Sequence, residues 1–104
     1  MAAAEVLWSP QARKDLLDLY VVIGLESPAA AERYFERIEA KAVMLAEHPR
    51  LGVRRAEIRP SLRMLIEPPF LLLYKTEPDS DEGSIDSVEI VRVIDGRRDL
   101  THLF

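Results

Sequence analysis

The chain contains no cysteine among its 104 residues. This absence excludes disulfide bonds, thiolate chemistry and metal sites built on cysteine. The chain also lacks an apolar run long enough to span a membrane. Its start, M-A-A-A-E, has neither the basic region nor the apolar core of a signal peptide. We therefore expect a cytoplasmic protein with one domain, residues 1–104.

An excess of basic charge is also lacking. The formal net charge is −4 at pH 7, which argues against nonspecific nucleic-acid binding driven by overall charge. The charges are segregated, because residues 50–63 contain five arginines and one glutamate, whereas residues 77–89 contain six acidic residues and no base. Arginine offers a planar fork that suits carboxylates and phosphates. Residues 50–63 therefore predict either an anion-facing ridge or a solvated connector that pairs with the acidic segment.

Residues suited to catalysis are scarce. The two histidines, His48 and His102, have no metal-ligand spacing, and we expect structural or solvated roles for them. The four glycines are isolated, which excludes a phosphate loop and the nucleophile elbow of Ser-His-Asp hydrolases. In residues 77–89 the paired carboxylates are typical of a solvated turn. The sequence therefore predicts no catalytic residue, no metal site and no cofactor.

Two serine–proline pairs predict the starts of two helices. Serine is a favoured N-cap residue, and proline fits the first helical position because its missing N–H would be unpaired there. After Ser9-Pro10, apolar residues recur with helical spacing at positions 16, 19, 20 and 23. We expect Gly24 to supply a left-handed exit. Ser27-Pro28 starts a second amphipathic helix, which Pro49 should end, and the two form an antiparallel hairpin.

Four segments predict β-strands: residues 5–8, 62–67, 70–75 and 88–94. The third, which begins F-L-L-L-Y, is apolar on both faces and should lie centrally. In the last strand we expect Val88, Ile90 and Ile94 on one face and Val91 and Val93 on the other. The order β-α-α-β-β-β predicts a single-domain α+β fold. Its helical hairpin packs on a mostly antiparallel four-stranded sheet.

The hairpin can cover only one face of this sheet, although the strands are apolar on both. Only the C-terminal tail remains for the second face. We expect Leu100, Leu103 and Phe104 to fold back on it, a partner protein to cover the apolar surface, or each arrangement in a different state.

Five motifs follow one another along nearly the whole chain: S-P-Q-A-R-K-D-L-L-D-L-Y at residues 9–20, S-P-A-A-A-E-R-Y at 27–34, L-A-E-H-P-R-L-G at 45–52, I-R-P-S-L-R at 58–63, and V-E-I-V-R-V-I-D-G-R-R-D-L at 88–100. Their order and spacing together resemble the ParE toxins of the RelE/ParE superfamily, found in bacterial type II toxin–antitoxin systems. One departure is Asp95, where ParE-like chains often carry histidine. We therefore expect no imidazole role at that position.

The resemblance implies a toxin that a ParD-like antitoxin neutralises by direct binding, in a hetero-oligomer that is a heterotetramer or larger. ParE toxins are described as inhibitors of DNA gyrase that catalyse no reaction, and the resemblance also implies a role in plasmid stabilization. Neither a membrane nor sequence-specific nucleic-acid binding by this chain is implied.

Two other functions stay open at this point. RelE members cut mRNA on the ribosome with lysines, arginines and a C-terminal tyrosine, together with a proton-transfer group. This chain has no lysine between residues 42 and 74 and no tyrosine after Tyr74, which favours gyrase inhibition over cleavage. The remaining alternative is a non-toxic module that only binds an antitoxin.

Two surfaces are expected to carry the function. The target or partner surface is predicted to include five arginines: Arg59, Arg63, Arg92, Arg97 and Arg98. The antitoxin groove should hold an amphipathic helix by apolar side chains. Its predicted residues are Trp8, Leu16, Leu19, Tyr20, Phe70, Tyr74, Leu103 and Phe104. Which face of the first helix belongs to the core and which to the groove stays open.

Overall fold

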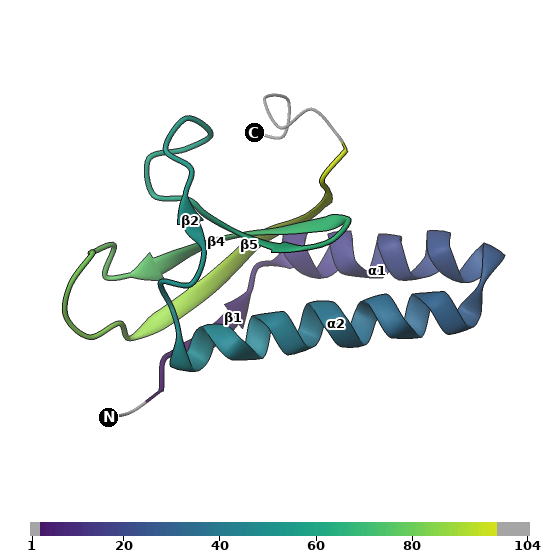
Figure 1. The fold of residues 1–104 in the computed structure, drawn as a ribbon, viewed down its shortest axis with the longest axis horizontal. Coiled ribbons are helices and arrows are strands. Elements are labelled where there is room, and N and C mark those ends of the chain that lie inside the picture. The colour runs from purple at the N-terminus through teal and green to yellow at the C-terminus, as the bar shows by residue number, and fades with distance from the viewer. Residues whose placement is uncertain (1–2, 98–104) are drawn as a thin grey trace.

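Two helices pack on one face of a five-stranded mixed sheet in the computed structural model, which describes residues 3–97 (Figure 1). Along the chain the elements are β1 (Glu5–Trp8), α1 (Pro10–Glu26), α2 (Pro28–Glu47), β2 (Val53–Arg54), β3 (Arg63–Glu67), β4 (Phe70–Glu77) and β5 (Ser87–Asp95). The strand order is β1-β5-β4-β3-β2. Within the described residues only β1 and β5 pair in parallel. The predicted α+β class is confirmed, with one strand more than expected because the two residues of β2 pair with β3.

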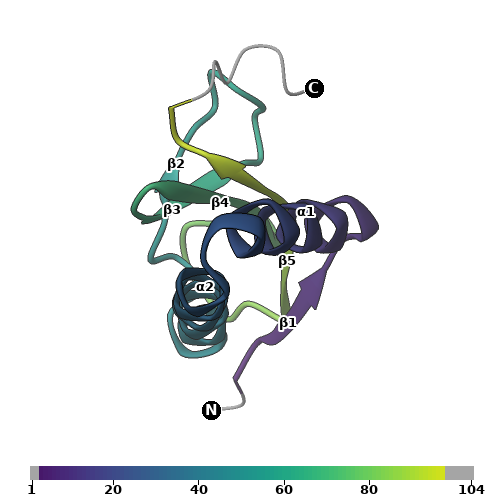
Figure 2. The ribbon, with the colours of Figure 1, turned by 90° about the vertical axis from the view of Figure 1, so that its right-hand side faces the viewer.

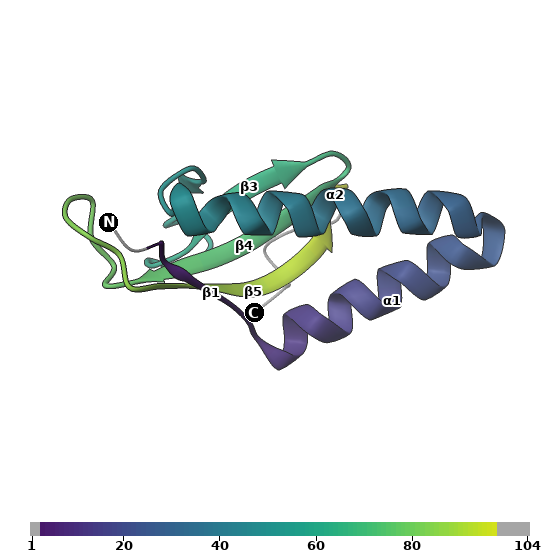
Figure 3. The same cartoon turned by 90° about the horizontal axis from the view of Figure 1, so that it is seen from below.

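A single residue, Ser27, joins the two helices. Its backbone N–H donates to Ile23 O at 2.9 Å at the end of α1, and its side chain accepts from Ala30 N at 3.2 Å at the start of α2. The predicted serine–proline start is therefore confirmed for α2, and Ser9 caps α1 in the same way. The connection is shorter than the expected helix end at Gly24 would leave, and Figures 1 and 3 show the tip of the hairpin projecting beyond the strands.

The expected left-handed exit at Gly24 is wrong. Gly24 lies inside α1, and Gly83 is the only residue with positive φ in the part of the chain that the structure describes. The helix continues to Glu26 and ends where Ser27 adopts an extended conformation, with φ −152° and ψ 100°. The proline at position 28 explains this end, because a residue before proline is disfavoured in the helical region.

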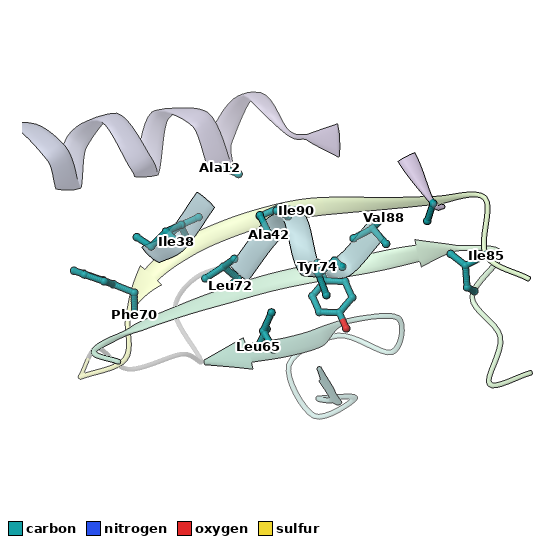
Figure 4. Packing of buried hydrophobic residues seen from close by; sticks show 13 residues of the cluster. Ala12, Ile38, Ala42, Leu65, Phe70, Leu72, Tyr74, Ile85, Val88 and Ile90 are labelled. Atoms are coloured by element: carbon teal, nitrogen blue, oxygen red, sulfur yellow. The ribbon is translucent and has the colours of Figure 1, made fainter. Parts of the chain in front are cut away.

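The main core lies between the helical hairpin and the sheet (Figures 2 and 4). The largest fully buried side chains include Tyr74, Leu72 and Ile90 from the sheet and Ile38 and Leu45 from α2. As predicted, β4 is central and its residues 70–74 are all buried. Leu71 and Leu73 point to the opposite face, where a smaller cluster forms.

A β-bulge changes which residues of β5 share a face. Leu73 pairs with Arg92 but Tyr74 pairs with Ile90, so Val91 is the extra residue. The predicted grouping of Ile94 with Val88 and Ile90 is therefore wrong. Val93 joins the main core beside Val88 and Ile90, whereas Ile94 and Val91 belong to the cluster on the other face. A period-two pattern cannot show a bulge, because the extra residue reverses the alternation after it.

The second sheet face is partly covered from within residues 3–97. Leu62, Leu71, Leu73 and Ile94 are buried there, with Ile58, Met64 and Val91 packed against them. The tail residues expected to fold onto this face lie outside the described part of the chain. Within the described residues, neither helix has the length and apolar character to cross a membrane.

Candidate functional site

An apolar groove of about 610 Å³ runs between α1 and α2. On its wall the rings of Tyr20 and Phe35 meet edge to face, with centroids 5.8 Å apart. The Tyr20 hydroxyl donates to the carboxylate of Glu32, and this hydrogen bond raises the pKa of Tyr20 above its usual value. We call this feature the helix groove; its lining residues are Trp8, Arg13, Leu16, Leu17, Tyr20, Glu32, Phe35 and Glu39.

The helix groove contains part of the predicted antitoxin groove. Trp8, Leu16 and Tyr20 line it. Leu19 is half-buried and packs against the main core. The remaining four predicted residues do not reach this surface in the described chain: Phe70 and Tyr74 are buried in the core, and Leu103 and Phe104 lie outside the described residues.

Sequence reasoning missed Leu17, Phe35 and the charged rim of the helix groove. Leu17 is 61 % exposed although it is a large apolar residue in the middle of a helix. Its position next to Leu16 hides it, because the helical period assigns Leu16, and not Leu17, to the apolar face. The rim is also asymmetric: α1 contributes Arg13, whereas α2 contributes Glu32 and Glu39.

A second polar feature lies where the β4–β5 connection meets the segment around β2. Three arginines contact the acidic loop, residues 78–86, and we call Arg50, Arg54 and Arg63 the arginine cluster. Arg54 lies 2.9 Å from Asp79 Oδ1 and 2.9 Å from Asp81 Oδ1. The same oxygen of Asp81 lies 3.1 Å from Arg63 Nη2. Of the five arginines in residues 50–63, these three contact the acidic segment, whereas Arg55 pairs with Glu57.

These contacts shift the ionisation of both partners. Hydrogen bonds from Arg54, with a further contribution from Arg63, lower the pKa of the Asp81 carboxyl below its ordinary 3.8. Hydrogen bonds to Asp81 and Asp79 raise the pKa of Arg54 in turn. Both directions favour the charged forms, so the acidic loop and the arginine cluster neutralise one another at neutral pH.

Arg63 is the buried member of the arginine cluster, with a side chain only 7 % exposed. Its Nη1 donates to Gly52 O at 3.3 Å. Among the described residues its buried Nε has no acceptor. Strand pairing explains the burial, because Arg63 lies opposite the fully buried Tyr74 in the sheet.

Arg92 lies in a different place and is tied to α1. Its Nε and Nη2 donate to the two carboxylate oxygens of Asp15 at 2.7 and 3.1 Å. Asp15 Oδ2 also accepts from Val93 N at 3.0 Å, and Asp15 Oδ1 accepts from Gln11 at 2.9 Å. β1 pairs with β5 only as far as Ile90, so Asp15 satisfies an edge N–H that would otherwise be unpaired in the sheet.

The predicted arginine surface is therefore dispersed in the structure. Arg63 is in the arginine cluster and Arg92 is held by Asp15. Arg97 is exposed and pairs with Asp95, which raises the pKa of Arg97. Arg59 is exposed in the loop between β2 and β3, and Arg98 lies outside the described residues. The cluster brings in Arg50 and Arg54 instead, and the signal for them was the segregation of basic charge in residues 50–63 from acidic charge in residues 77–89.

No group of three or more histidine, cysteine or acidic residues within residues 3–97 is arranged to hold a metal ion. His48 caps the end of α2 through its backbone N–H, which donates to Met44 O at 2.9 Å.

Comparison with protein families places these features in a known context. Residues 6–100 match the family described as ParE toxin of type II toxin–antitoxin system, parDE. The chain belongs to the ParE toxin family. The match covers both the helix groove and the arginine cluster, and it agrees with the resemblance that the five sequence motifs carry.

Two relatives of this ParE-family chain come from Caulobacter vibrioides (strain ATCC 19089 / CIP 103742 / CB 15). Toxin RelE2 is 35 % identical over 72 residues, which are 68 % of this chain and 78 % of RelE2. Toxin ParE3 is 34 % identical over 70 residues, which are 67 % of this chain and 63 % of ParE3. The aligned part thus spans less than two thirds of ParE3.

A solved structure described as the chromosomal ParDE TA system from P. aeruginosa has the same fold. The TM-score is 0.69 with 22 % sequence identity, and the superposition covers 89 % of this chain and 96 % of that one. The ParE-family fold is thus retained where most side chains differ.

Proposed function

We propose that this ParE-family toxin is neutralised by direct binding of a ParD-like antitoxin and that it inhibits DNA gyrase without catalysing a reaction. The observation that carries the proposal is the match of residues 6–100 to the family of ParE toxins of parDE systems. The helix groove gives an antitoxin a place to bind, and the paired arginines favour a binding role over phosphate chemistry.

The helix groove fits an amphipathic helix of the antitoxin. Such a helix inserts apolar side chains at i, i+3 or i+4 and i+7 into a groove between secondary-structure elements. The walls supply apolar contacts from Trp8, Leu17 and Phe35. The rim charges favour one orientation, with an acidic edge of the partner near Arg13 and a basic edge near Glu32 and Glu39.

A pair of matched substitutions tests this docking site. Leu17→Lys places a charge in the helix groove, whereas Val43→Lys places one on α2 at a similarly exposed position (61 % and 64 % exposed) that does not line the groove. We expect Leu17→Lys to weaken antitoxin binding about tenfold or more. A leucine side chain that the bound antitoxin covers contributes about 1.5–3 kcal/mol to the binding free energy. Val43→Lys should bind like the parent chain. If a calorimetric titration gives the two variants equal affinities for the antitoxin, the antitoxin binds outside the helix groove.

The contacts of the described arginines argue against the endonuclease alternative. Arg63, Arg92 and Arg97 each pair with a carboxylate of this chain. Phosphoryl-transfer chemistry needs cations that face the phosphate and a proton-transfer group within reach. The gyrase proposal predicts that purified chain inhibits DNA supercoiling by gyrase in a dose-dependent way and that an equimolar antitoxin restores supercoiling. Unaffected supercoiling at excess toxin would refute the gyrase target.

The similarity to toxin RelE2 leaves open a second candidate function for this chain, that of a ribosome-dependent mRNA endonuclease. In that case arginines alone would stabilise the charge on the phosphate. Translating ribosomes with a reporter mRNA distinguish the two candidates: cleavage in the presence of the chain supports the endonuclease, and intact mRNA together with inhibited gyrase supports the proposal.

A further inference from the structure

We propose that the arginine cluster is a binding site for an acidic peptide segment, and that the chain's own acidic loop occupies this site as a displaceable cover. This surface is distinct from the helix groove. Figures 1 and 3 place the β4–β5 loop at the end of the molecule opposite the tip of the helical hairpin. Peptide binding here goes beyond the proposed gyrase inhibition and does not depend on it.

The contacts in the arginine cluster are those of peptide recognition. Arg50 donates from Nε to Ser80 O at 3.0 Å and from Nη2 to Gly83 O at 2.9 Å. Arg54 contacts the carboxylates of Asp79 and Asp81. The cluster therefore binds both main-chain carbonyls and side-chain carboxylates of one short segment. A nucleic acid offers no peptide carbonyls, and the chain's net charge of −4 opposes a polyanion.

The buried guanidinium of Arg63 requires an anion at this site. A charged group removed from water is strongly destabilising unless it is paired and hydrogen-bonded. Asp81 is the carboxylate that Arg63 contacts in the described chain. The Nε of Arg63 still has no acceptor among the described residues. The arginine cluster thus has a hydrogen-bond donor that the acidic loop does not use.

The carboxylates of the acidic loop are held weakly enough for a partner to displace them. The side chains of Asp79 and Asp81 are 42 % and 75 % exposed while they contact the arginines. Exposed ion pairs contribute little to stability and are screened by salt. A partner segment with two or more carboxylates can therefore replace the loop carboxylates while Arg63 stays paired.

The acidic loop itself has the chemistry of the expected partner, so the probe is a synthetic peptide with the sequence of residues 77–86, E-P-D-S-D-E-G-S-I-D. The test protein is the full chain carrying Asp79→Asn and Asp81→Asn, which loosens the cover. The matched control carries Glu77→Gln and Glu82→Gln. It removes the same number of charges from acidic residues that make no ion pair with a described residue.

We expect the Asp79→Asn/Asp81→Asn variant to bind the peptide roughly tenfold more tightly than the parent chain, because the loop loses its ion pairs from Asp79 to Arg54 and from Asp81 to Arg54 and Arg63. The affinity should fall with rising salt. The Glu77→Gln/Glu82→Gln control should resemble the parent. An equal gain in the control would show that only net charge matters and would overturn the proposal. Preference of the Asp79→Asn/Asp81→Asn variant for duplex DNA over the peptide would overturn the peptide assignment.

Loss of Asp81 leaves Arg63 without its carboxylate and can compromise folding. The single variant Asp79→Asn keeps the Arg63–Asp81 pair and should show a gain of about threefold. In the parent chain, saturating peptide should speed amide hydrogen exchange of residues 79–84, because the loop leaves the cluster. Unchanged exchange with peptide bound would mean that the peptide binds elsewhere, which contradicts the proposal.

Discussion

Tyr74 connects the middle of the sheet to the segment that precedes β2. Its hydroxyl accepts from Gly52 N at 2.8 Å and donates to Pro49 O at 2.9 Å, and its side chain is fully buried. Burial raises the pKa of Tyr74, so the hydroxyl keeps its proton over the physiological range. The backbone of Gly52 lies so close that a Cβ there would be 2.6 Å from the tyrosine ring.

Replacing this residue by phenylalanine tests that connection. Tyr74→Phe should lower the free energy of unfolding by about 1–3 kcal/mol, because the buried N–H of Gly52 loses its acceptor. Tyr34→Phe is the matched control. The Tyr34 ring contacts Phe70, but its hydroxyl makes no hydrogen bond with residues 3–97, so we expect a change within about 0.5 kcal/mol. Urea unfolding measures both, and equal effects would show that the Tyr74 hydroxyl does not stabilise this connection.

Single residues also show where sequence reasoning stopped. Trp8, Leu16 and Tyr20 were expected in the antitoxin groove that the family resemblance implies, and they line the helix groove. Arg63 was expected on a surface, yet it is buried. Its burial depends on Asp81, a residue 18 positions away, and on its register opposite Tyr74. Such partners are set by tertiary pairing, which no local pattern encodes.

At the scale of elements, Asp15 joins α1 to the bulged part of β5. Removing it by Asp15→Ala should lower the free energy of unfolding by roughly 3 kcal/mol, because Arg92 loses the bidentate carboxylate of Asp15 and the buried N–H of Val93 loses its acceptor. Asp18→Ala, which removes an exposed carboxylate paired with Lys14 on the same helix, should have little effect. Chemical unfolding of the two variants compares them directly. A small effect at Asp15 would mean that β5 does not need this helix contact.

The acidic loop should respond to pH in a defined direction. The pKa of Asp81 is lowered in the folded chain, so its stabilising contribution is present above the ordinary value of 3.8 and is lost as pH falls through the folded pKa. Carboxyl-carbon NMR should show Asp81 titrating below 3.8 in the parent and closer to it in Arg54→Gln. Arg55→Gln is the control, since Arg55 pairs with Glu57. A shift of Asp81 in the control as large as in Arg54→Gln would contradict the assigned cause.

Elements with local chemical signals were predicted well. Ser9-Pro10 and Ser27-Pro28 mark the starts of α1 and α2, because capping needs only neighbouring residues. The two residues of β2 have no pattern of their own and form a strand only through pairing with β3. The bulge at Val91 likewise arises from pairing with β4. Both exceptions depend on partner strands, so the sequence pattern could not show them.

At the scale of the whole molecule, the chain separates two surfaces. The helix groove is apolar with a charged rim, and the arginine cluster is polar and already covered by the acidic loop. An antitoxin that binds the groove therefore need not compete with the loop. We expect substitutions in one surface to leave binding at the other unchanged when both are measured in the full chain.

The most direct test of the central claim is expression of this chain alone in a bacterial host, with growth, SOS induction and mRNA integrity scored together. The proposed gyrase inhibition predicts growth arrest with SOS induction and intact mRNA. Co-expression of the cognate antitoxin should restore growth. Growth arrest with cleaved mRNA and no SOS induction would contradict the claim and assign the chain to the ribosome-dependent nucleases. Normal growth at high expression would also contradict it and leave a module that binds an antitoxin without toxicity.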